Sequence, residues 1–208
     1  MGDSGSTIIG SNISTPILLN EVFSRDRFYL NTAIPAPYNG NITRFGYCYY
    51  GRPDNGRETY QALVSVYRPM TAGNGFMNIM NAVPIIKRTP ISQVPVADAL
   101  MPGSNCDSIE LGASVQVLEG DVIGACLSSD DGLRRLDVVS ESMDNGYRML
   151  YINSNSINDC ASLPGIVLRE TAESGGNPVL EELAESLILH IFAEICELLS
   201  IEDVIMCV

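Results

Sequence analysis

Histidine is almost absent from the 208-residue sequence, which contains only His190. Hydrolases with Ser-His-Asp or Cys-His sites use a histidine as general base, so any such site would depend on this one residue. Metal sites built from several histidines are excluded. On a strand, His190 would face away from Leu189 and Ile191, which is an ordinary half-exposed position. The sequence therefore predicts no enzyme, and carboxylate-only catalysis of the glycosidase type is the least favoured rival.

Positive charge is missing from the end of the chain. No Lys or Arg follows Arg169, whereas nine acidic residues do, and the formal net charge is −13. A chain this acidic repels phosphate backbones, so nucleic acid is excluded as a partner. A solubilising acidic surface is the simplest interpretation, and a basic partner or calcium is the alternative.

Three further signals are absent. No uninterrupted apolar run reaches about 18 residues, so no membrane span is predicted. No secretory signal peptide is visible at the N-terminus. No cysteine pair has C-x-x-C spacing, which disfavours zinc ribbons and thioredoxin-like sites.

Short runs of alternating apolar residues fill much of the chain, a period typical of strands. Asn or Asp before Gly at 54–56, 130–132 and 144–146, and the triplet Glu119-Gly120-Asp121, provide residues that suit tight turns. Many short strands at this spacing predict an all-β fold, an antiparallel jelly-roll-like β-sandwich. The predicted strands are 43–49, 60–66, 111–117, 122–127, 136–139 and 147–152.

The C-terminal part fits two periods. Asn177-Pro178 followed by Glu181 is typical of a helix start, yet the residues from 187 to 195 also alternate as in a strand. Periodicity leaves both open, with a short helix before the last strand or in the C-terminal tail as one outcome. We expect a flexible N-terminus at 1–6, one β-sandwich domain at 7–195 and an acidic, apolar tail at 196–208.

Three sequence elements occur in a fixed order: ITRFGYCYY at 42–50, VQVLEGDVIGAC at 115–126 and LILHIFA at 187–193. Together they resemble a poorly characterised module of sponge and other early-branching animal cell-surface proteins, over roughly residues 7 to 195. The resemblance implies an extracellular β-sandwich with 187–195 as its closing strand. It carries over no catalytic or ligand-binding residue.

Four aspartates are candidate calcium ligands. Asp130, Asp131 and Asp137 could gather around one hairpin loop, with Asp121 on a neighbouring turn, and calcium takes several hard oxygen ligands. However, the D-x-[DN]-x-[DN]-G loop is absent, and Asp-Asp-Gly is in itself a sufficient turn signal. The sequence therefore predicts no cofactor, with calcium as the alternative.

Three tyrosines are candidates for a ligand-binding face. Tyr47, Tyr49 and Tyr50 could stack on a sugar, although aromatic residues in alternating strands more often belong to a core. Tyr49 and Tyr50 must point to opposite faces of a strand, so one of them is expected to meet solvent or a second layer.

The six cysteines and two glycosylation sequons favour an extracellular location. Cys48 and Cys126 lie in predicted strands and are candidates for a bridge across the sandwich; Cys106 and Cys160 are candidates for a second. Six cysteines allow fifteen complete pairings, and buried free thiols are the alternative. The sequons at Asn12 and Asn41 permit glycosylation of a secreted chain.

These features predict an extracellular, non-catalytic binding or adhesion module of a secreted or cell-surface protein. Its partner would be a protein or a glycan. The alternatives are a structural or matrix protein that functions by self-association and a lectin-like carbohydrate-binding module.

Overall fold

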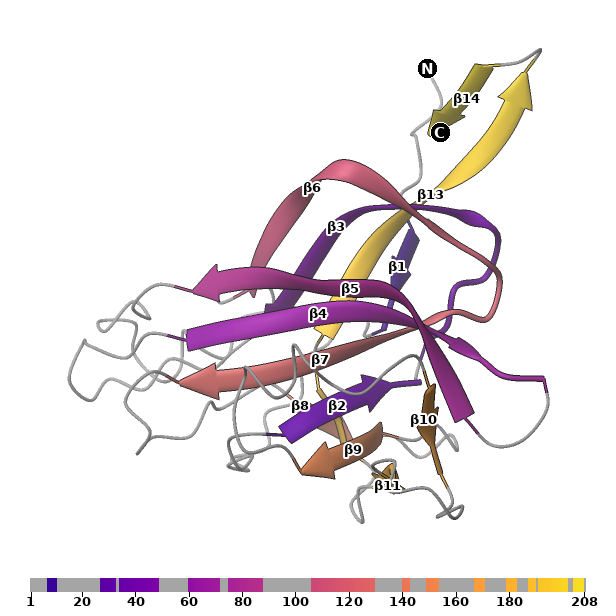
Figure 1. The fold of residues 1–208 in the computed structure, drawn as a ribbon. Helices are drawn as coiled ribbons and strands as arrows, with labels where there is room; N and C mark the ends of the chain where they lie inside the picture. The colour runs from indigo at the N-terminus through magenta and orange to yellow at the C-terminus, as the bar shows by residue number, and fades with distance from the viewer. Residues whose placement is uncertain are drawn as a thin grey trace.

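The computed structural model describes residues 7–10, 27–32, 34–48, 60–71, 75–87, 106–129, 140–142, 149–153, 167–170, 179–182, 187–189, 191–201 and 204–207. All of its strands form antiparallel pairs, and no helix occurs in these ranges. The expectation of an all-β sandwich is confirmed: two sheets lie one above the other (Figure 1).

The first layer is a five-stranded sheet in the order β1-β13-β3-β6, with β14 paired to β13. The strands of this sheet are β1 (Thr7–Ile9), β3 (Gly40–Cys48), β6 (Cys106–Val117), β13 (Ile191–Ile201) and β14 (Val204–Cys207). In Figure 1, β13 and β14 extend beyond the rest of this sheet as a hairpin.

The second layer is a seven-stranded sheet in the order β10-β5-β4-β7-β2-β9-β11. Its strands are β2 (Arg27–Asn31), β4 (Tyr60–Pro69), β5 (Gly75–Lys87), β7 (Val122–Ser129), β9 (Met149–Asn153), β10 (Val167–Arg169) and β11 (Glu181–Glu182). A separate small sheet pairs β8 (Ser140–Ser142) with β12 (Leu187–Leu189).

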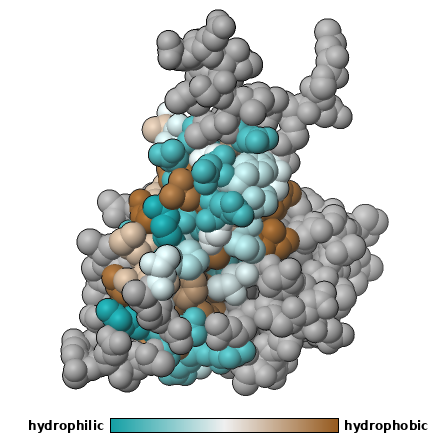
Figure 2. All heavy atoms as spheres, turned by 90° about the vertical axis from the view of Figure 1, so that its right-hand side faces the viewer, coloured by the Kyte–Doolittle hydropathy of each residue, from teal (hydrophilic) through white to brown (hydrophobic). Residues whose placement is uncertain are grey.

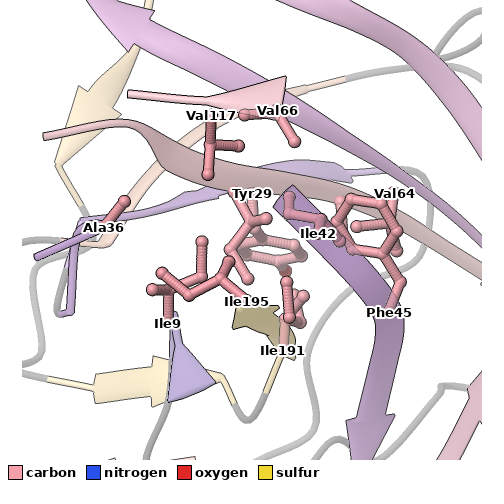
Figure 3. Packing of buried hydrophobic residues seen from close by; sticks show 13 residues of the cluster. Ile9, Tyr29, Ala36, Ile42, Phe45, Val64, Val66, Val117, Ile191 and Ile195 are labelled. Carbon is pink, nitrogen blue, oxygen red and sulfur yellow. The ribbon is translucent and has the colours of Figure 1, made fainter. Parts of the chain in front are cut away.

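Alternation along the strands builds the main core between the two sheets. Phe45 on β3 and Ile195 on β13 face Tyr29 on β2 and Val64 on β4, and all four are buried (Figure 3). Neighbouring residues on β2 and β7 point the other way, into a second buried cluster on the outer face of the seven-stranded sheet. Both faces of that sheet are therefore covered, which explains the nearly continuous apolar runs in β2 and β7.

Most of the predicted strands are confirmed, because β3, β4, β6, β7 and β9 overlap the runs with period two. The predicted strand at 136–139 and the Gly-containing turns at 54–56, 130–132 and 144–146 lie outside the described residues. The turn at 119–121 is present, with Gly120 at a φ of +89°. It joins strands of different sheets and not the two strands of a hairpin, since β6 pairs with β3 whereas β7 pairs with β2 and β4.

The helical alternative for the C-terminus is wrong wherever the structure describes it. Residues 187–189, 191–201 and 204–207 are strand, as the closing-strand interpretation requires. Strand β13 continues through residue 195, where we placed the end of the domain, and turns back into β14. Long-range pairing explains the outcome. Strand β13 lies between β1 and β3, and the burial of its residues there outweighs the local helix signals. Within the described residues, no helix is long and apolar enough to cross a membrane.

Candidate functional site

Strand β6 forms one edge of the five-stranded sheet. It pairs with β3 on one side, and none of the described strands pairs with its other side. Strand β5 of the opposite sheet approaches β6 without being paired to it. Most of the central part of β6 is open to solvent; the exposed residues are Ser108, Ile109, Glu110, Gly112, Ala113, Ser114 and Gln116. A long exposed edge strand offers backbone N–H and C=O groups to another chain.

The middle of β6 bulges away from β3. Ile42 is opposite Val115 and Arg44 is opposite Glu110, so Thr43 alone on β3 faces the four residues 111–114 of β6. We call residues 111–114 the β6 bulge. A Cβ added at Gly112 would meet no atom within 4 Å, so the space beside the bulge is open. Bulges redirect an edge strand and often lie next to binding sites.

A row of three charged side chains crosses the outer face of the sheet beside the β6 bulge. Arg44 on β3 donates hydrogen bonds to Glu110 on β6 at 2.8 Å and to Glu194 on β13 at 3.4 Å. The hydrogen bond to Glu110, together with the negative charge of Glu194, raises the pKa of Arg44. The row carries two carboxylates for one guanidinium, and the Glu110 side chain remains 79% exposed. It therefore presents excess negative charge next to β6.

The C-terminal end of β6 is held by a buried carboxylate. Asp121 is fully buried and accepts hydrogen bonds from the Arg68 guanidinium and from the Leu118 backbone amide, the latter at 2.7 Å. The amide of Glu119 donates to the Asn39 side chain, and Ala36 exchanges backbone hydrogen bonds with Gly120 and Asp121. These contacts fix the direction in which β6 leaves the sheet.

Partly buried apolar side chains lie on both β5 and β6. Ile79, Met80 and Val83 on β5, with Leu111 and Val115 on β6, are only partly buried where they contact the core. Ile109 and Leu118 are the large apolar side chains most exposed among the described residues. On the face shown in Figure 2, the coloured hydrophobic residues form small separate areas among hydrophilic ones. These side chains therefore offer local apolar contacts and do not form one broad hydrophobic surface.

The structure places two of the predicted site residues in structural roles. Asp121, a calcium candidate, directs its carboxylate to Arg68 and the Leu118 amide. Asn41 of the second sequon lies within β3, between β13 and β6, and not in a loop. No group of three or more His, Cys, Asp or Glu side chains that could hold a metal gathers in the described part of the chain.

For each of the other candidates, either the residue or its side chain is not among those that the structure describes. Tyr47 is on β3, but its side chain is not described, and Cys48 and Cys106 are likewise placed by their backbones only. The remaining candidates, none of which falls within the described ranges, are Tyr49, Tyr50, Asp130, Asp131, Asp137, Asn12, Cys160 and His190.

Two cysteines have described side chains, Cys126 and Cys196, and neither is a free thiol. Cys126 belongs to the cluster on the outer face of the seven-stranded sheet, whereas Cys196 lies on β13 of the other sheet.

The β6 bulge was not predicted from the sequence. The neighbouring small residues Gly112, Ala113 and Ser114 were the available signal, because they contribute little to a core. Their significance depends on the register between β6 and β3, which cannot be read from either strand alone.

Comparisons with models of known protein families, with curated proteins and with solved structures find no match for this chain.

Proposed function

We propose that this protein is a non-catalytic binding module that works outside the cell, and that strand β6 receives an extended segment of a protein partner. The observation that carries the proposal is the exposed edge of β6 with its four-residue bulge. In this mode of recognition, the partner adds a strand to the sheet; backbone hydrogen bonds supply affinity and side-chain contacts supply specificity.

The charge of the site favours a basic partner segment. The chain has a net charge of −13, and the row of Glu110, Arg44 and Glu194 beside β6 has an excess of carboxylates. A second copy of the same edge would bring like charges together, whereas lysine or arginine side chains on a partner strand would lie close to Glu110. Electrostatic complementarity of this kind increases the association rate and selects between partners.

Two observations support a location outside the cell. Neither Cys126 nor Cys196 is a free thiol, which supports disulfides at both, and disulfides persist mainly in oxidising compartments. The resemblance to cell-surface modules points the same way. The lone histidine supports a binding rather than a catalytic role, because acyl-transfer catalysis commonly requires that residue type.

We further infer that the sandwich is a jelly roll. Eight strands support this inference: β1-β13-β3-β6 in one layer and β2-β7-β4-β5 in the other. Successive strands alternate between the layers, apart from the β4–β5 hairpin and the insertion of β8 to β12 before β13. Two four-stranded sheets that exchange strands in this manner are typical of jelly rolls.

Site-specific photocrosslinking tests the proposed binding strand. A photoreactive amino acid would replace Gly112, where the surrounding space is open, and in a control protein it would replace exposed Glu182 on β11. Both proteins would be irradiated with an extracellular matrix extract, and crosslinked species would be identified by mass spectrometry. We expect a discrete partner crosslinked from position 112 and not from position 182, through a peptide rich in Lys or Arg. Equal labelling from both positions would overturn the proposed strand, and a crosslinked dimer of the chain itself would indicate self-association instead.

A further inference from the structure

Cys48 and Cys106 occupy directly opposed positions in the five-stranded sheet. Cys48 is the last residue of β3 and Cys106 the first residue of β6, and they are register partners. Opposed residues in an antiparallel pair have Cα atoms about 4.5–5.5 Å apart and lie on the same face of the sheet. Disulfides bridge Cα atoms about 4.4–6.8 Å apart, so these two positions suit a disulfide across the strands.

Neither Cys126 nor Cys196 is a free thiol, and the fold keeps them from bonding to each other. Cys126 is buried on the outer face of the seven-stranded sheet with Phe28 and Val122. Cys196 alternates with the core residue Ile195, so it lies on the outer face of the five-stranded sheet, with Sγ 3.5 Å from the carbonyl oxygen of Asn41. Two packed sheets, about 10 Å apart, lie between these outer faces.

The disulfide partner of Cys126 follows from which sheet each of the other cysteines belongs to. Cys48, Cys106 and Cys196 all lie in the five-stranded sheet, and Cys207 lies on β14, which is paired to β13 of that same sheet. All four are separated from the outer face of the seven-stranded sheet that holds Cys126. The cysteine left for Cys126 is Cys160.

The partner of Cys196 follows from position along the strands. Cys196 is opposite Asn41, and Cys48 lies seven residues further along β3, which is about 23 Å at the rise of a strand. Cys106 is opposite Cys48 and is equally remote. Cys207 is the register partner of Leu198, the second residue after Cys196 on β13, so Cys207 and Cys196 occupy diagonally neighbouring positions of the hairpin. With Cys160 assigned to Cys126, the partner of Cys196 is Cys207.

We propose that the six cysteines form three disulfides: Cys48–Cys106, Cys126–Cys160 and Cys196–Cys207. The first ties the start of the edge strand β6 to β3, the second anchors the segment after β9 to the outer cluster, and the third closes the terminal hairpin. Each bond forms by exchange with a disulfide oxidant R–S–S–R: two cysteine thiols lose two protons and two electrons, and the oxidant leaves as two R–SH molecules. This connectivity replaces the Cys48–Cys126 and Cys106–Cys160 pairs considered from the sequence.

Peptide mapping of the full, non-reduced chain tests the connectivity. Trypsin alone is insufficient, because no Lys or Arg separates Cys106 from Cys126 or Cys196 from Cys207. Cleavage by trypsin and a glutamate-specific protease, after free thiols are alkylated at mildly acidic pH, separates every cysteine. We expect three linked peptide pairs matching the proposed bonds and no alkylated cysteine. A Cys48–Cys126 or Cys106–Cys160 linkage, or six alkylated cysteines, would overturn the proposal.

Single variants provide an independent measurement. Cys48→Ser should leave one free thiol, located at Cys106, whereas Cys160→Ser should leave one at Cys126. Double replacement of Cys48 and Cys106 should leave none and should increase amide hydrogen exchange at the start of β6. A free thiol at Cys126 in Cys48→Ser would contradict the assignment. If a variant fails to fold, the peptide map of the unaltered chain still decides between the connectivities.

Discussion

The guanidinium of Arg68 on β4 donates two hydrogen bonds to the carboxylate of Asp121, with Nε–Oδ1 and Nη2–Oδ2 distances of 2.8 and 3.0 Å. The pair joins the seven-stranded sheet to the turn that follows β6. Its hydrogen bond to the carboxylate raises the pKa of Arg68, although burial acts in the opposite direction. A buried carboxylate of this kind is tolerated because each of its oxygens has a partner.

Asp121→Asn should therefore destabilise the fold by about 2–4 kcal/mol, because it removes the charge that compensates Arg68 and disturbs the hydrogen bonds within a buried site. The matched control is Arg44→Met, which breaks the solvent-exposed row with Glu110 and Glu194 and should cost less than about 1 kcal/mol. Both values come from chemical unfolding under non-reducing conditions. Equal losses for the two variants would mean that Asp121 has no special structural role.

Two glycines on different sheets should respond differently to the same substitution. A Cβ at Gly124 would overlap the Phe28 ring and would lie 2.9 Å from the Tyr67 ring; the two rings contact each other edge to face. Gly124→Ala should therefore cost about 1–3 kcal/mol through overpacking. Gly112→Ala has open space and should change the free energy of unfolding by no more than about 1 kcal/mol, in the stabilising direction if at all. Thermal unfolding of both variants checks the difference; an equally large loss at Gly112 would show that the β6 bulge is tightly enclosed.

The strands could be predicted locally because alternation is a property of neighbouring residues. Phe45 and Val64 repeat with period two and do face the core. The features that define the candidate site depend on register between distant segments. Nothing in the sequence indicates that Thr43 faces four residues of β6 or that Cys48 is opposite Cys106. The C-terminal strand was ambiguous for the same reason, since Ile191 and Ile195 become core residues only when β13 enters between β1 and β3.

Burial of the Tyr67 phenol should make stability depend on alkaline pH. Tyr67 is 2% exposed, and burial raises its pKa to about 12, from an ordinary value of 10.0, while a hydrogen bond with Ser65 acts in the opposite direction. The unfolded chain then releases this proton at a lower pH than the folded chain. The contribution of the neutral phenol is fully present below pH 10 and is lost as the pH rises from about 10 to about 12.

Over that range the unaltered chain should lose about 2 kcal/mol more stability than Tyr67→Phe, which has no proton to release. Other tyrosines titrate in both proteins, so the difference between the two unfolding curves isolates Tyr67. Tyr67→Phe loses the hydrogen bond with Ser65 at every pH. This loss shifts its whole curve of unfolding free energy against pH by a constant amount and does not change the slope. Parallel curves from pH 9 to pH 12 would show that the phenol is accessible to water.

A proline in the β6 bulge should separate binding from stability. Ala113 is exposed and has no register partner on β3, and proline is tolerated at bulges and edges of sheets. Ala113→Pro removes one backbone N–H that an added strand would use, so the fold should be nearly unchanged while binding is weakened. Ala113→Ser, which keeps the N–H, is the matched control.

The probe for this experiment is an eight-residue peptide of alternating lysine and valine, titrated by calorimetry at low and at moderate salt. The unaltered chain and Ala113→Ser should bind it, more weakly at higher salt because ions screen the attraction to Glu110. Ala113→Pro should bind at least about tenfold more weakly, a loss of about 1.4 kcal/mol. A glutamate–valine peptide of the same length should not bind, because it repels the carboxylates beside β6. Undiminished binding to Ala113→Pro would place the recognition of basic segments somewhere other than the β6 bulge.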